Sequence, residues 1–202
     1  MRSLLKPLAL AGLVFLAGAA PAFAHLSPEE HGSFMAGFSH PLFGLDHILA
    51  MVAVGLWAAM IGGRAVTLVP LSFVGTMTLG FLLAFTGIAL PFVEPAILAS
   101  VIALGLLLAT AVKLPTEIGM IVVGTFALFH GFAHGGEIGA ATHLEYGLGF
   151  AAATSLLHIV GIGIGLLIGA GIVMPKKTGQ AIARVLGGIA AALGIGLATG
   201  VV

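Results

Sequence analysis

The chain has 202 residues, of which 60% are hydrophobic and only 7% are charged, and its net charge is zero. This composition lies far outside the range of soluble globular domains, and a neutral chain offers no electrostatic footprint for nucleic acid. Because the chain contains no cysteine, disulfides and thiolate metal ligands are excluded.

The N-terminal residues 1–24 have the pattern of a secretory signal peptide. A positive segment with Arg2 and Lys6 precedes an apolar run over residues 8–16, and Ala22-Phe23-Ala24 forms a small-x-small cleavage site. Cleavage would leave His25 as the first residue, outside the membrane. The alternative is an uncleaved first transmembrane helix, but the apolar run is short for one.

A short helix at the outer membrane surface is predicted over residues 28–38. Ser27 can cap it, Pro28 suits its first position, and a Glu follows at the third. Pro41 then suits the start of the first membrane span, with Ser39 or His40 as its cap.

Six hydrophobic segments follow, each near the roughly 20 residues needed to cross a bilayer. They are expected at about 41–61, 66–90, 96–112, 117–140, 146–173 and 181–201. Short connections predict antiparallel neighbours. We therefore expect an all-α integral membrane protein, with residues 25–202 forming one compact domain of six transmembrane helices.

The charged residues predict an orientation in the membrane, which we expect to be a bacterial inner membrane. With the mature N-terminus outside, the inner side carries five basic residues, and the two outer connections carry none. The five are Arg64, Lys113, Lys176, Lys177 and Arg184. This is the positive-inside pattern, and it places both mature termini on the periplasmic side.

Small residues repeat every four positions in the last two spans. They are Gly161, Gly165 and Gly169, and then Gly188, Ala192, Gly196 and Gly200. Such faces allow helix backbones to approach closely. They predict a tight bundle, or a homo-oligomer interface if the last helix faces lipid.

The first predicted span begins with an ionisable cluster. On one helix, His40 and His47 would lie within about 20° of each other, and Asp46 would either widen this ligand face or orient a histidine of a neighbouring helix. Met51 follows one turn later as a soft-ligand option, although a lone methionine usually packs. Ionisable residues are costly in a membrane and usually mark an ion pathway.

The fourth predicted span carries the second cluster, with His130, His134 and Glu137 at i, i+4 and i+7 on one stripe. At 1.5 Å per residue, His130 and His47 are expected at about the same depth. The two clusters would therefore face one another and form a metal site. His158 could be a deeper station or an ordinary hydrogen-bonding residue, whereas His25 and His31 could capture metal at the outer mouth.

The pattern favours a secondary permease for a divalent transition metal, because no phosphate-binding loop for ATP is present. The metal would be a transported substrate, with no permanent cofactor and no nucleotide partner. Two alternatives remain: a metal-binding accessory protein or sensor without flux, and an intramembrane metalloenzyme. The second lacks a His-Glu-x-x-His motif, so we predict no enzymatic activity.

Both clusters resemble the signatures of the HupE/UreJ family of nickel/cobalt permeases. One signature is His, five residues, Asp-His, matched by residues 40–47; the other is Phe-His-Gly-x-Ala/Val-His-Gly-x-Glu, matched by residues 129–137. The similarity covers nearly the whole chain. It implies uptake of Ni²⁺, with Co²⁺ as the second candidate, for hydrogenase or urease assembly.

Overall fold

The computed structural model describes residues 28–136, 138, 142–169 and 174–202, and the side chains of 28–32 are excluded from the description. The predicted signal peptide, and with it His25, therefore lies outside the described residues. Within them every regular element is helical. The elements are α2 (Pro28–Phe43), α3 (Leu45–Ile61), α4 (Ala65–Leu83), the 3-10 turn η1 (Ala84–Thr86), α5 (Val93–Thr110), α6 (Thr116–Gly136), α7 (His143–Gly169) and α8 (Lys176–Thr199).

The predicted fold class, an all-α membrane bundle, is confirmed. Five helical segments are long and apolar enough to cross a membrane: α4 with η1, α5, α6, α7 and α8. These correspond to the second through sixth predicted spans, and each begins within five residues of the expected position. The bent pair α2 and α3 would supply a sixth span.

The first span differs from its prediction. A separate helix over 28–38 and a continuous helix over 41–61 were both wrong: α2 runs through Pro41 to Phe43, the chain breaks at Gly44, and α3 departs at 80°. Both halves are fixed on α7, where Gly37 abuts the backbone of Tyr146 and Gly55 abuts that of His158. Because α2 and α3 are anchored separately on one helix, the chain must bend between them.

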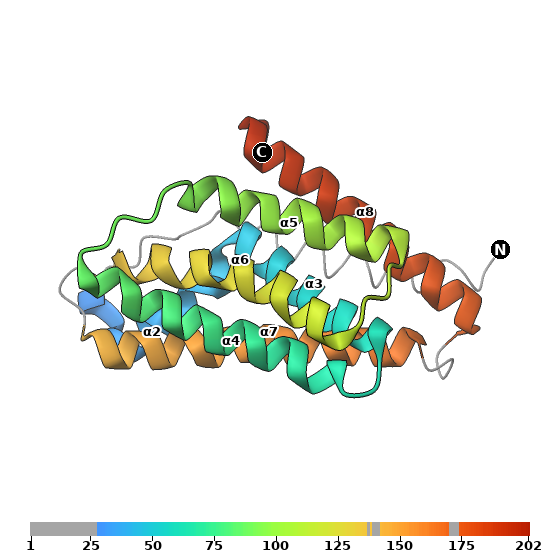
Figure 1. Ribbon diagram of the computed structural model, residues 1–202, viewed down its shortest axis with the longest axis horizontal. Coiled ribbons are helices and arrows are strands. Elements are labelled where there is room, and N and C mark those ends of the chain that lie inside the picture. Colours follow the sequence, from blue (N-terminus) through green and yellow to red (C-terminus); the bar gives the residue numbers. More distant parts are fainter. Residues whose placement is uncertain (1–27, 137, 139–141, 170–173) are drawn as a thin grey trace.

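Consecutive spans from α3 to α8 run antiparallel along the long axis of the bundle (Figure 1). The connections α3–α4, α5–α6 and α7–α8 share one end, which we call the basic end because Arg64, Lys113, Lys176 and Lys177 lie there. At this end Arg64 pairs with Glu117, although both side chains are exposed. We call the opposite end, where α6 meets α7, the cluster end.

Glycines allow four pairs of helices to touch backbone to backbone. A methyl group on any of these glycines would collide with the backbone of the partner helix. The pairs are Gly80 and Gly131 between α4 and α6, Gly55 and Gly161 between α3 and α7, Gly37 and Gly149 between α2 and α7, and Gly105 and Gly187 between α5 and α8. These contacts replace the hydrophobic drive that lipid removes.

The close packing predicted for these small-residue faces occurs within the bundle on α7 but not on α8, for which the predicted alternative of a homo-oligomer interface stays a prediction. On α7, Gly161 and Gly165 both meet α3, although Gly169 has open space around it. On α8, the neighbouring position Gly187 packs against α5, whereas Gly188 faces open space. A run of glycines satisfies two repeats shifted by one residue, so sequence spacing could not select the packed face.

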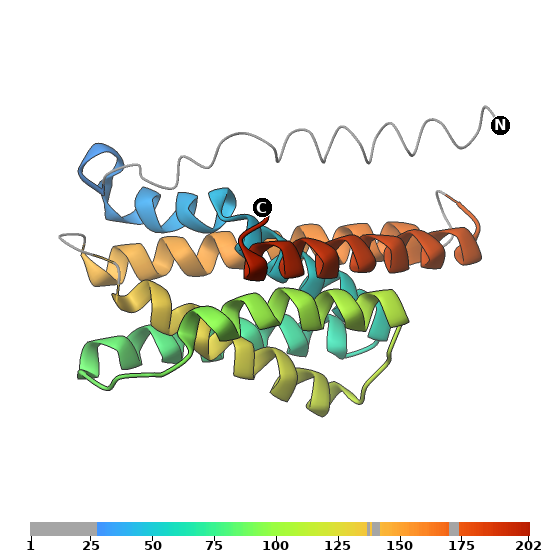
Figure 2. The same cartoon turned by 90° about the horizontal axis from the view of Figure 1, so that it is seen from above.

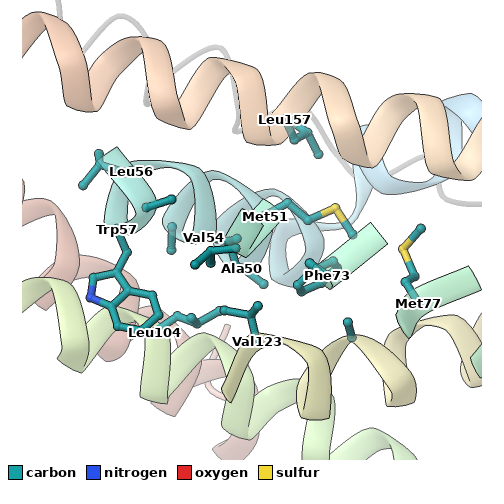
Figure 3. Packing of buried hydrophobic residues seen from close by; sticks show 14 of the residues in the cluster. Ala50, Met51, Val54, Leu56, Trp57, Phe73, Met77, Leu104, Val123 and Leu157 are labelled. Carbon is teal, nitrogen blue, oxygen red and sulfur yellow. The ribbon is translucent and has the colours of Figure 1, made fainter. Parts of the chain in front are cut away.

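The apolar core is centred on α3 and reaches α4, α5, α6 and α7 (Figure 3). Trp57 is its largest side chain, is fully buried, and donates its indole N–H to the Val112 carbonyl at 2.8 Å. This bond satisfies the one polar group of that ring, as buried indoles require. The view along the perpendicular direction shows α2 and α7 side by side (Figure 2).

Candidate metal site

Three histidines from three helices meet at the break between α2 and α3. His40 lies in the last turn of α2, His47 in the first turn of α3, and His134 in the last turn of α6. Each can offer one ring nitrogen such that all three nitrogens lie within 4.8 Å of one another. His47 and His134 are buried, whereas His40 is half-buried. The predicted facing of the first and fourth spans is thereby confirmed.

The bend changes how these side chains converge. On a straight helix, His40 and His47 would share a face two turns apart. Here they belong to separate helices, and their ring centroids lie 5.8 Å apart. His134 reaches both, at 4.4 Å from His40 and 4.7 Å from His47. The break thus gathers the ligands more closely than the continuous helix that we predicted.

Asp46 orients its neighbour His47. Its Oδ1 lies 2.8 Å from His47 Nδ1, and because a carboxylate only accepts, Nδ1 must carry the proton. The lone pair of neutral His47 then lies on Nε2, which is 2.5 Å from His134 Nε2. A carboxylate that fixes a ligand imidazole in this way is common at metal sites. Asp46 therefore orients a histidine, which was one of its two predicted roles, but the histidine belongs to its own helix and not to a neighbouring one.

Gly44 provides the space for this pair. A methyl group on it would lie 2.9 Å from His47 Nδ1 and 3.0 Å from Asp46 Oδ1. Its backbone has φ −82° and ψ 116°, which any residue can adopt. Glycine is therefore needed here for room beside the imidazole and not for its conformational freedom.

His130 extends the cluster one turn along α6. Its ring is fully buried and lies 5.3 Å from that of His47. Its Nδ1 lies 3.0 Å from the Phe126 carbonyl oxygen, so Nδ1 donates and the lone pair is on Nε2. Within the described residues, Nε2 has no hydrogen-bond partner. It is available as a further ligand.

The other candidates separate into two groups. Glu137 and His25 lie outside the described residues, as does the His31 side chain. Met51 is fully buried in the apolar core, and His158 lies deeper, beside Phe73.

Sequence reasoning missed the aromatic rings that line the cluster, because a phenylalanine in a membrane span carries no distinguishing signal. Phe150 shows this: its ring is 4.5 Å from that of His134.

These features define a class of protein: a multi-pass helical membrane protein with a histidine cluster at a break in one span. The chain belongs to the HupE/UreJ family, because the family model described as "HupE / UreJ protein" matches residues 13–197. It is also similar to Protein HupE of Rhizobium leguminosarum bv. viciae, with 49% identity over 180 residues, or 89% of this chain and 91% of that one. A comparison with solved structures found no match.

Proposed function

We propose that the protein is a secondary permease that takes up a divalent transition metal, with Ni²⁺ as the first candidate and Co²⁺ as the second. The observation that carries this proposal is the convergence of His40, His47 and His134 within a membrane bundle. The bilayer interior offers a cation no water, and three imidazoles can replace part of the water shell that the cation loses there.

The ligand chemistry supports a transition metal. Imidazole nitrogen suits nickel, cobalt and zinc, whereas magnesium and calcium prefer oxygen. Nitrogen ligands alone would favour copper by the Irving–Williams order, so geometry and metal availability must supply selectivity. The family membership adds the expectation of nickel delivered for hydrogenase or urease assembly.

The broken span supports transport over static binding. Transporters often bind their substrates where a membrane helix is interrupted, because the free helix ends and nearby side chains line the site. Here the interruption at Gly44 lies between His40 and His47. A site on two separately anchored half-helices can open by moving one half against the other.

The membrane potential can supply the energy. A divalent cation that moves inward gains about 4.6 kcal/mol per 100 mV of inside-negative potential, at about 2.3 kcal/mol per charge. We propose that the cluster end faces the periplasm and the basic end faces the cytoplasm of a bacterial inner membrane. Both mature termini then lie outside, after removal of residues 1–24.

Proteoliposomes test this function. We expect purified protein to carry Ni²⁺ into vesicles, at a rate that rises with an inside-negative potential and without ATP. Empty vesicles and vesicles with a His134→Ala variant serve as controls. Nickel binding without flux would contradict a permease and favour an accessory protein or sensor, and bound zinc with hydrolytic activity would favour a metalloenzyme.

Replacing Gly44 by alanine should weaken cation binding without unfolding the bundle. The new methyl group would displace the Asp46–His47 pair, and loss of such a supporting contact typically costs about 10–100-fold in metal affinity. We expect the low end of this range, measured as the nickel concentration at half-maximal uptake. Gly75→Ala is the matched control, since Gly75 has open space around it. Equal half-maximal concentrations in the two variants would contradict the role of Gly44.

A further inference from the structure

His158 is a buried imidazole that the cluster at the α2–α3 break does not include. It lies on α7, its side chain is 1% exposed, and neither ring nitrogen has a hydrogen-bond partner among the described residues. A neutral imidazole always carries one N–H donor and one lone pair. Burying both unsatisfied is costly, so such a group in a folded protein calls for an explanation.

The surroundings of His158 connect it to the cluster. The Phe73 ring on α4 lies 5.0 Å from the His158 ring and 5.7 Å from the His130 ring. His130 in turn lies 5.3 Å from His47. An unbroken series of ring contacts therefore leads from the break at the cluster end to the middle of α7. Two of its members, His130 and His158, hold ring nitrogens without partners.

Further donor atoms lie one helical turn from His158. Thr154, one turn earlier on α7, is fully buried and donates its hydroxyl to the Met77 sulfur at 3.6 Å. The Thr154 oxygen and the Met77 sulfur can both act as metal ligands. Figure 3 shows Met77 and Phe73 within the same buried cluster. Imidazole, hydroxyl and thioether together suit a later first-row divalent cation better than magnesium.

We infer that His158, with the Thr154 hydroxyl one turn away on α7, forms a second and deeper binding station for a divalent transition-metal cation. The inference rests on the proposed function, because the cation would reach this station from His47 and His134. Apart from the histidines, the buried polar side chains that the structure describes include Thr154 and Ser100, and the Ser100 hydroxyl is satisfied within α5 by the Ile97 carbonyl. His158 is thus the buried polar group outside the first cluster for which the described residues supply no hydrogen-bond partner.

Nickel binding by purified variants tests this station without relying on transport. We call the cluster of His40, His47 and His134 the first site. A His47→Ala/His134→Ala double variant lacks this site, and we expect it to retain about one weakly bound Ni²⁺ per chain in equilibrium dialysis. Adding His158→Leu should abolish that binding, whereas adding His143→Leu, which changes an exposed histidine, should preserve it. No binding in the double variant, or binding that survives His158→Leu, would overturn the inference.

A second arm applies if the double variant does not fold. His158→Leu alone should leave nickel affinity at the first site within about threefold of the parent protein but reduce flux into proteoliposomes at least tenfold. His158→Gln should reduce flux similarly, because the glutamine amide oxygen suits hard cations, whereas nickel prefers imidazole nitrogen. Undiminished flux in both variants would overturn the deeper station. If the parent protein binds nickel but carries no flux, the permease proposal fails, and dialysis still decides the deeper station.

Discussion

Replacing His134 by alanine is expected to reduce nickel uptake to the background of cells that lack the protein. His134 is the imidazole that reaches both His40 and His47, so its removal leaves the remaining two without their common partner. The change deletes a ring near the end of α6 and leaves the glycine contacts between helices intact. Membrane abundance should therefore remain near normal while accumulated metal falls at least tenfold.

The control for this experiment is His143→Ala, which removes an exposed histidine near the cluster end, where its ring stacks on Phe85 at 4.3 Å. Uptake in that variant should match the parent protein. The same loss as for His134 is expected for His47→Ala, and Asp46→Asn should lose uptake because the amide does not orient the imidazole as a carboxylate does. Full nickel uptake in His134→Ala, His47→Ala and Asp46→Asn would contradict the proposal that the metal crosses the membrane through this site.

Replacing Gly131 by valine is expected to prevent stable assembly of the bundle. Any side chain at this position meets the Met77 carbonyl on α4, and a backbone group cannot rotate away. Overpacking typically costs about 1–3 kcal/mol, and a rigid partner places this variant at or above the upper end. We expect loss of folded protein, measured as the monodisperse fraction in mild detergent and as the thermal transition.

Gly75→Val is the matched control, because Gly75 lies on α4 with open space around it. That variant should remain within about 0.5 kcal/mol of the parent protein, as is usual for surface changes. Equal folded fractions for the two valine variants would show that α4 and α6 do not touch through their backbones. The helix packing described above would then be incorrect.

Much of the fold follows from hydropathy alone. The spans α4 to α8 were predictable because a run of apolar residues of bilayer length has few other uses. The antiparallel arrangement followed from short connections, and it brought His47 of the first span to His130 and His134 of the fourth. It was also predictable that these two stripes of ionisable residues face each other, because such residues are costly in lipid and point into the bundle interior.

The break at Gly44 was not predictable in the same way. Pro41 is the stronger local signal for a helix boundary, yet the helix continues through it for two more residues. Tertiary anchoring decides the outcome, because α2 and α3 are each pinned to α7 by glycine contacts distant in sequence. The contact of Asp46 with His47 was not predicted either, because adjacent residues point about 100° apart on a helix and the expected partner was a histidine of a neighbouring helix.

The role of His158 could not be decided from the sequence. A lone histidine in a membrane span is equally consistent with a hydrogen bond to a neighbouring helix and with a ligand. The absence of a partner on either nitrogen within the described residues removes support for the first. Whether a partner lies within reach depends on the neighbouring helices, such as α4 with Phe73 beside the His158 ring, and no local pattern encodes their positions.

The central claim is that imidazoles from α2, α3 and α6 together replace the water shell of one cation. X-ray absorption at the nickel edge of the nickel-loaded protein measures this directly, because imidazole rings give a characteristic scattering pattern. With one nickel ion per chain, so that the first site fills before the weaker deeper station, we predict three imidazoles around nickel in the parent protein and two in His134→Ala. A nickel ion surrounded by oxygen alone, or the same imidazole number in both proteins, would contradict the claim.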